Sequence, residues 1–164
     1  MKKLILSFLM ICAVVVGAMA KDGAPKPGSP ISMVSRDALR DFAFQFFDAT
    51  NVTWKVDEDY QKAIFNLDGK VVCAMYNNQG QFLMASEQVA SSELPETVLA
   101  SLREDYSDYK ISDIVKVVSR PSGYQKHNDI GSYWTALRKD NEVIYLLVAP
   151  EGAAKVVRKA TISK

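Results

Sequence analysis

Residues 60–80 read YQKAIFNLDGKVVCAMYNNQG, and residues 132–152 read SYWTALRKDNEVIYLLVAPEG. A shift of 72 positions without a gap carries the turn Asp68-Gly69 onto Asp140-Asn141 and carries Gly80 onto Gly152. The same shift places the apolar run 71–76 on the apolar run 143–148. Two copies of one supersecondary unit usually share a core and build one continuous surface. These two segments therefore predict a tandem repeat.

Each copy is predicted to hold one helix and four antiparallel strands. Ser35 caps the first helix, and Leu94-Pro95 opens the second. Apolar residues then recur at spacings of three and four, as one helix face requires. Two-residue turns led by aspartate join alternating runs, which is typical of hairpins. The expected helix faces are Leu39, Phe42, Ala43, Phe46 and Phe47, then Val98, Leu99, Leu102 and Tyr106; the expected strands are 52–56, 60–67, 70–76, 81–86, 109–118, 133–139, 142–149 and 153–161.

The predicted fold class is α+β. Two tandem α-β-β-β-β repeats, about 35–90 and 91–164, form one antiparallel sheet with both helices on one face. They make up a single domain, 35–164. The helices are about 60 positions apart rather than 72, and the missing dozen residues are an insertion, Ser119–Ser132. A long loop in one copy is often where function is added.

The N-terminal residues predict export. Met1-Lys2-Lys3 is a basic start, Leu4 to Val16 is apolar, and Ala18-Met19-Ala20 is a cleavage motif, so residues 1–20 read as a signal peptide cleaved after Ala20. The apolar run is shorter than the roughly 20 residues of a membrane-spanning helix. Residues 21–34, rich in proline and glycine, are expected to be a flexible tether. The predicted location is periplasmic or secreted.

The residues that remain after cleavage offer little for catalysis. They carry 18 basic and 19 acidic side chains, because Lys2 and Lys3 are lost from a total of 20, and this balance argues against nucleic acid as a partner. Cys73 is the remaining cysteine and is expected to be buried or inert. His127 is the single histidine, so a multi-histidine metal site is excluded. We predict no catalytic residues, no metal and no cofactor.

The hairpin turns also predict which side chains share a face. If Asp68-Gly69 is a two-residue loop, Phe65 opposes Val72, and Ala63 opposes Ala74. That face is the more apolar and is assigned to the helices. The opposite face should be polar if it is solvated, yet it carries large apolar side chains, as a protein-binding patch does. The predicted partner-binding residues are Ile64, Met75, Trp134, Tyr145 and Leu147, with Tyr124 and His127 of the insertion.

Three alternatives to a binding patch stay open for this apolar face. The tether or the insertion covers it, a second copy of the chain covers it by self-association, or the register is shifted by one residue and the faces exchange.

The order of motifs resembles the PepSY-like, β-lactamase-inhibitor-like exported proteins of Bacteroides-type bacteria. The motifs are Phe46-Phe47, 51–54, 60–65, Asp68-Gly69, 74–76 and Gly80, continued by Leu94-Pro95, Val98, Leu102, Tyr106 and 109–111. The resemblance implies tandem helix-plus-four-strand repeats, export, no catalytic residues, and a sheet face that binds a protein. The inhibitors proper are stapled by disulfides within their repeats, whereas this exported chain keeps one cysteine.

Three functions follow, in order of support. The first is a non-enzymatic exported binding protein, or protein inhibitor, whose open sheet face binds an envelope or secreted protein. The alternative is a periplasmic carrier of a small apolar ligand held on the same face. An enzyme is the third and would require a deep pocket with convergent polar groups.

Overall fold

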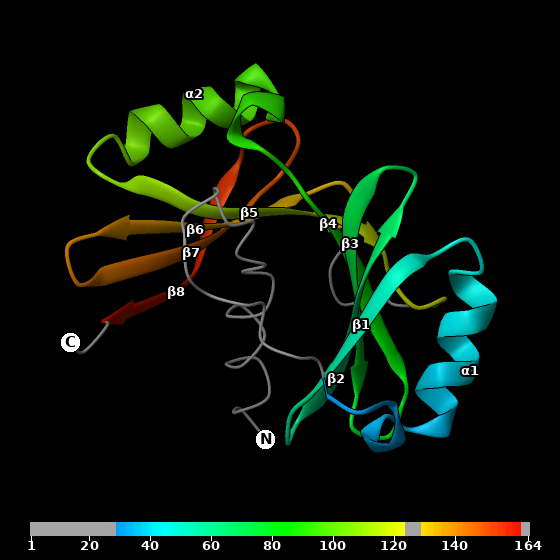
Figure 1. Ribbon diagram of the computed structural model, residues 1–164. Helices are drawn as coiled ribbons and strands as arrows, with labels where there is room; N and C mark the ends of the chain where they lie inside the picture. Colours follow the sequence, from blue (N-terminus) through cyan, green and yellow to red (C-terminus); the bar gives the residue numbers. More distant parts are fainter. Residues whose placement is uncertain (1–28, 124–128, 162–164) are drawn as a thin grey trace, which may run out of the picture. The chain divides into compact units, whose positions relative to one another are not determined.

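The structure is a computed structural model that describes residues 29–123 and 129–161 (Figure 1). The expected signal peptide, the first part of the expected tether, Tyr124 and His127 lie outside these residues. The described chain forms two compact units that divide between Leu83 and Met84. Each unit is described by itself below.

The predicted fold class is confirmed. In the described residues, two α-helices accompany one eight-stranded antiparallel sheet, whose strand order follows the chain from β1 to β8. Each helix is followed by four strands, as two tandem α-β-β-β-β repeats require. The elements are η2 (Ile31–Met33), α1 (Arg36–Gln45), β1 (Thr50–Val56), β2 (Tyr60–Leu67), β3 (Lys70–Asn77), β4 (Phe82–Gln88), η3 (Ser91–Glu93), α2 (Glu96–Asp105), β5 (Lys110–Ser119), β6 (Tyr133–Lys139), β7 (Glu142–Val148) and β8 (Ala154–Thr161).

The β2–β3 hairpin of unit 1 has the predicted register. Asp68 and Gly69 form the two-residue turn with φ of 51° and 76°, the left-handed region that this kind of turn needs. Phe65 consequently pairs with Val72, and their side chains point to the same face of the sheet. A register shifted by one residue, which would have exchanged the two faces, is therefore excluded for this hairpin.

Helix α1 packs on the face that carries Phe65. The Phe42 ring lies 5.0 Å from the Phe65 ring, edge to face, and 5.4 Å from Trp54. Phe65 is buried, and burying a side chain of this size contributes about 2 kcal/mol. The predicted helix face is wrong at Ala43 and Phe47, which are exposed. The reason for Phe47 is that α1 ends at Gln45 and Phe46 caps it, so the next residue no longer follows the helical period.

Unit 2 repeats this packing around the turn at Asp140, where φ is 50°. Leu137 pairs with Ile144 as predicted, and both are buried. Helix α2 contributes Val98 and Leu102 to the same core. The core of unit 2 is Leu94, Val98, Leu102, Ile114, Tyr133, Leu137, Ile144, Leu146 and Val148.

The two glycines of the repeated sequence have the same structural role. Both hold the left-handed backbone, with φ of 83° at Gly80 and 98° at Gly152. A Cβ at Gly80 would lie 2.4 Å from Ser35 Oγ, and one at Gly152 would lie 2.6 Å from the carbonyl oxygen of Thr97. In each unit, the turn before the last strand of the repeat therefore abuts the start of the helix, and only glycine fits there.

The last residues of the expected tether, 29–34, are part of unit 1, and Ser29 is hydrogen-bonded to strand β1. Ser29 donates its N–H to the carbonyl of Trp54 at 2.8 Å, and its Oγ accepts the N–H of Val56 at 3.0 Å. Val34 is buried beside the helix cap, so this segment covers the outer edge of β1.

Candidate functional site

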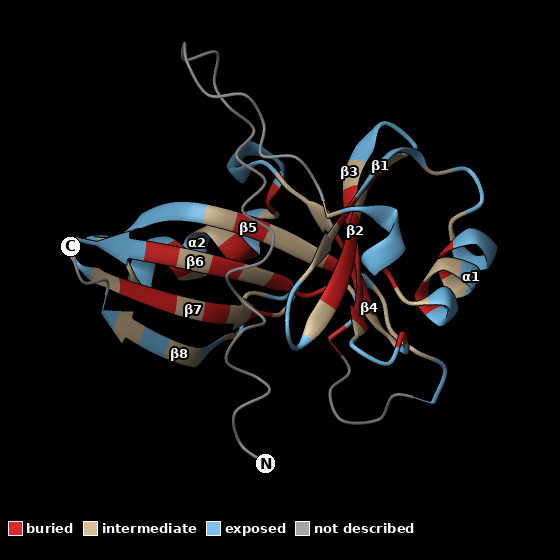
Figure 2. Ribbon diagram, turned by 60° about the horizontal axis from the view of Figure 1, so that its bottom comes forward, coloured by how far each residue is buried: buried red, intermediate tan, exposed pale blue. Residues whose placement is uncertain are grey.

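The sheet face of unit 2 opposite α2 carries large apolar side chains. On β6 and β7, the buried residues of the core alternate with half-buried ones that point the other way (Figure 2). Trp134 pairs with Leu147, and Ala136 pairs with Tyr145. Because paired residues share a face and faces alternate, Trp134, Tyr145 and Leu147 lie together on it.

The neighbouring strands extend this face. Val115 of β5 pairs with Trp134, and Lys155 of β8 pairs with Leu147. One row across the four strands is therefore Val115, Trp134, Leu147 and Lys155. The next row is Asp113, Ala136, Tyr145 and Arg158, with Asp113 half-buried. Aromatic and aliphatic side chains occupy the two middle strands. The charged side chains lie on β5, which has Asp113 beside Val115, and on β8, which has Lys155 and Arg158.

The first copy is different at the positions 72 residues earlier. Trp134 corresponds to Lys62, Tyr145 to Cys73, and Leu147 to Met75. All three residues of the first copy are buried, and they lie on the face opposite α1. The burial of Cys73 confirms that prediction.

The predicted partner-binding residues fall into three groups. Ile64 is half-buried and Met75 is buried on neighbouring strands of unit 1. The three residues of the unit 2 face are together and half-buried. The two remaining ones, Tyr124 and His127, lie outside the described residues.

The base of the insertion is held by a buried ion pair that the sequence did not reveal. Arg120 donates from Nε to Asp129 Oδ1 at 2.8 Å, and its Nη2 binds Asp129 Oδ2. Both side chains are buried. Gly131 donates its N–H to the Val117 carbonyl at 2.8 Å, which ties the end of the loop to β5. Nothing local in the sequence marks this pair, because its members meet only in the folded chain.

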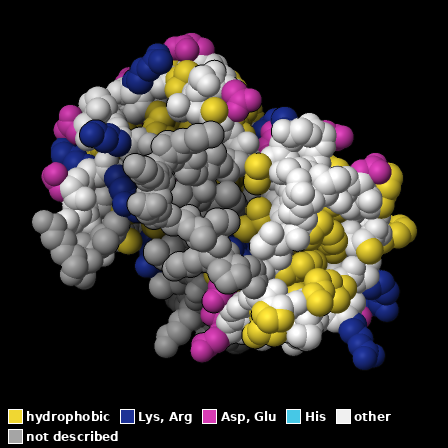
Figure 3. All heavy atoms as spheres, in the orientation of Figure 1, with side chains coloured by type: hydrophobic (Ala, Val, Ile, Leu, Met, Phe, Trp, Pro, Cys, Tyr) yellow, Lys and Arg dark blue, Asp and Glu magenta, His cyan; other side chains and the backbone are white. Residues whose placement is uncertain are grey.

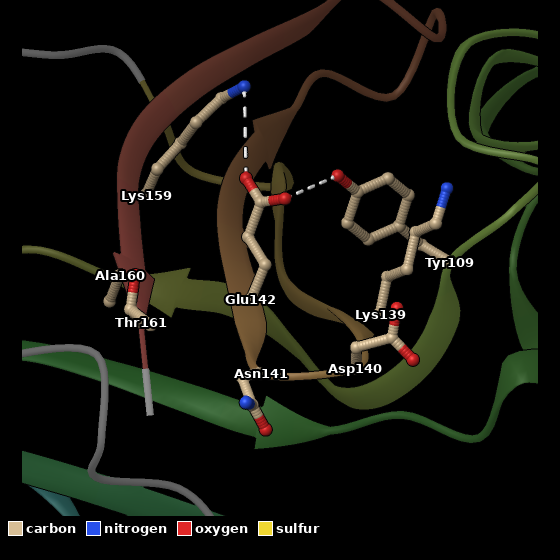
Figure 4. A pocket seen from close by; sticks show the side chains of 8 residues that line it. All are labelled: Tyr109, Lys139, Asp140, Asn141, Glu142, Lys159, Ala160 and Thr161. Atoms are coloured by element: carbon tan, nitrogen blue, oxygen red, sulfur yellow. Dashed lines mark hydrogen bonds and ion pairs between the residues drawn. The ribbon is translucent and has the colours of Figure 1, made fainter. Parts of the chain in front are cut away.

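A polar cleft of about 490 Å³ lies at the β6–β7 turn of unit 2 (Figure 4). The hydroxyl of Tyr109 donates to Glu142 Oε2 at 2.9 Å, and Lys159 Nζ lies 4.0 Å from Glu142 Oε1. Lys139 Nζ binds Asp108 Oδ2 at 2.8 Å and lies 5.7 Å from the centre of the Tyr109 ring. Glu142 is therefore bonded to Tyr109 and lies within ion-pair distance of Lys159, and Lys139 is paired with Asp108.

These pairings set the protonation of the cleft. The hydrogen bond to Glu142 raises the pKa of Tyr109. The hydrogen bond between Lys139 and Asp108 raises the pKa of the lysine and lowers that of the aspartate. These pKa shifts keep Tyr109 and Lys139 protonated and Asp108 ionised at neutral pH. A general acid or base instead requires a pKa close to the working pH.

Metal-ligating side chains do not gather in the described part of the chain, where no cluster of three or more histidine, cysteine, aspartate or glutamate residues is found. Within residues 29–123 and 129–161, neither helix has the length and apolar character needed to cross a membrane.

Solved structures from Bacteroides have the same fold. A BLIP-like protein from Bacteroides fragilis NCTC 9343 superposes with a TM-score of 0.61 at 16% identity, over 80% of this chain and 88% of that one. A DUF2874 family protein from Bacteroides ovatus ATCC 8483 gives 0.61 at 20% identity, over 78% and 87%. A protein from Bacteroides eggerthii DSM 20697, whose description suggests a periplasmic location, gives 0.59 at 16% identity, over 78% and 88%.

The chain has the fold of the BLIP-like and DUF2874 proteins. The predicted resemblance is confirmed at this level, and at these identities the likeness concerns the fold alone. The sequence matches no protein-family model and no curated protein.

Proposed function

We propose that the protein is a non-enzymatic exported binding protein that holds a protein partner on the sheet face of unit 2. The carrying observation is the group Trp134, Tyr145 and Leu147 on the face that α2 leaves uncovered. A solvated sheet face carries polar residues at such positions. Tryptophan and tyrosine are also the residues that dominate binding energy at protein interfaces.

Three further observations support this proposal. Strand β8, beside the apolar centre, carries Lys155 and Arg158 on this face, and a charged border of this kind is common at interfaces. The first copy has Lys62 and Cys73 in place of the two aromatic residues, so the repeat scaffold does not itself require them. The BLIP-like and periplasm-associated proteins that share the fold favour export and a protein partner.

The test compares how much of a partner three proteins capture from the envelope fraction of the producing bacterium. These are the wild-type protein, the double variant Trp134→Ala/Tyr145→Ala and a matched control. The control is Ile111→Ala, which also removes an exposed apolar side chain of unit 2 but lies on the sheet face that carries the core residue Leu137. Two interface aromatics that each contribute about 2 kcal/mol predict roughly a thousandfold weaker binding. Equal capture by the wild-type protein and the Trp134/Tyr145 variant would end the proposal.

A carrier of a small apolar ligand is the second function for the same face. A ligand that binds only the folded state raises the melting temperature by mass action. The binding-protein proposal expects no shift with fatty acids or other apolar ligands. A shift that disappears in Trp134→Ala would favour the carrier.

A further inference from the structure

Unit 1 exposes apolar side chains at both ends of α1. Phe44 is 85% exposed and Phe47 is 79% exposed at the C-terminal end of the helix; we call them the aromatic pair. Ile31 is 60% and Met33 is 58% exposed just before its N-terminal end; we call them the aliphatic pair. Figure 3 shows hydrophobic side chains at the surface on the side of the molecule where α1 lies.

The second copy of the repeat shows that the scaffold does not need these side chains. Helix α2 begins 60 residues after α1, and the core positions correspond at this step. Val34 and Leu94 are buried alike, and so are Ala38 and Val98. The four exposed apolar residues correspond instead to polar ones, because Ile31, Met33, Phe44 and Phe47 stand opposite Ser91, Glu93, Glu104 and Ser107.

The exposed apolar area is large enough to matter. A phenylalanine or tryptophan side chain carries roughly 150–250 Å² of surface, so the aromatic pair exposes on the order of 300 Å². With the aliphatic pair at the other end of the helix, the exposed apolar area of one chain totals roughly 500 Å² in two separate patches. Contact of both patches on each of two chains would bury about 1,000 Å², which is the lower limit for a specific interface.

The charges between the two pairs favour a second copy as the occupant. Along α1, two arginines and two aspartates alternate in sign as Arg36, Asp37, Arg40 and Asp41. Arg40 and Asp37 bind each other at 2.9 Å and are exposed. A surface of one sign would repel its own copy, whereas this mixed surface carries no net charge and therefore does not.

The order of these features along the helix also suits a two-fold axis. In an isologous dimer, residue i contacts residue j and residue j contacts residue i. When two α1 helices pack antiparallel, the C-terminal end of one lies beside the N-terminal end of the other. The aromatic pair of each chain then meets the aliphatic pair of its partner, and the mixed charges meet at the centre.

We propose that the protein forms a two-fold dimer in which the α1 helices of two copies pack antiparallel. The interface lies on the helix side of unit 1. It is separate from the sheet face of unit 2 that the proposed function uses, so either surface can fail its test without the other.

Two double substitutions copied from the second repeat provide the first test. Phe44→Glu/Phe47→Ser and Ile31→Ser/Met33→Glu place at each position the residue that the second copy already has there. Light scattering coupled to gel filtration and analytical ultracentrifugation measure the dimer constant of protein purified after export, and circular dichroism confirms that each variant is folded. We expect a wild-type dimer that either double substitution weakens at least tenfold. A wild-type monomer at about 100 µM, or a dimer that survives either substitution, would overturn the proposal.

Cysteine crosslinking provides a second test of the geometry. Arg40 lies near the middle of the predicted interface, so Arg40→Cys is expected to form a disulfide with itself across the two-fold axis under mild oxidation. The matched control is Ala100→Cys at the corresponding exposed position of α2, which should not form a disulfide between chains. Equal crosslinking of both variants, or crosslinking of Ala100→Cys alone, would refute the antiparallel α1 interface.

Discussion

Gly80→Ala should destabilise the protein far more than Gly69→Ala, although both glycines have similar backbone angles. The two positions have φ of 83° and 76°, so alanine at either costs about 1 kcal/mol for the left-handed conformation. At Gly69 nothing lies within 4 Å of the added Cβ, and this cost is the whole effect. Gly69→Ala is therefore a matched control for the backbone strain.

The difference comes from the start of α1. A Cβ at Gly80 would lie 2.4 Å from Ser35 Oγ and 2.8 Å from the backbone nitrogen of Ala38. These two atoms form the helix cap, with Oγ accepting the Ala38 N–H at 3.2 Å. Moving them apart loses the cap, which costs about 1 kcal/mol. Shifting packed backbone adds about 1 kcal/mol or more.

We expect a loss of about 3 kcal/mol for Gly80→Ala and about 1 kcal/mol for Gly69→Ala. Urea unfolding followed by circular dichroism and tryptophan fluorescence measures both, with the slopes unchanged if only stability differs. If the free energies of unfolding of the two variants differ by less than about 0.5 kcal/mol, close contact with the helix cap is not the reason for glycine at position 80.

Three further predictions concern buried polar groups. Gln61→Met should cost about 2–4 kcal/mol in urea unfolding, because the buried amide accepts the Ser35 N–H at 2.7 Å and donates to two carbonyls of the β3–β4 turn. Asp129→Ala should cost about 3–5 kcal/mol by leaving the Arg120 charge buried; a cost below about 1 kcal/mol would contradict the ion pair. Asp113→Asn should stabilise at pH 7, because burial raises the pKa of this carboxyl and its ionisation therefore opposes folding. That gain should vanish below about pH 4, where the carboxyl is protonated in both states; a gain that is constant with pH would refute the argument.

The fold was predictable because its decisive signals are local. Each aspartate-led turn fixes the pairing of two strands, and a period of two then assigns every side chain on them to a face. The prediction succeeded at Phe65 and Ile144 for this reason. It failed at Phe47, because helical spacing continues in the sequence after the helix itself has ended at Gln45.

The candidate site was less predictable because it depends on pairings in space. The period of two placed Trp134 and Tyr145 on one face, and the register agrees. Arg120 and Asp129 are joined across the insertion, and Tyr109 reaches Glu142 from another region of the sequence. In both cases the partners come together only when the chain is folded. No spacing rule marks such groups, and their chemistry is visible only in the folded unit.

Comparison of the two copies of the repeat separates core positions, which have the same burial in both, from surface positions, which carry different residue types. Where side chains meet the core, the copies agree in burial, as Val34 and Leu94 do. Their surface aromatic residues lie in different places. The first copy exposes aromatic side chains at its helix, and the second carries them on its sheet face. The other copy folds with different residues at these positions, so the repeat scaffold does not itself require either group. We propose an external contact for each group, and residues exchanged between the copies test each contact separately.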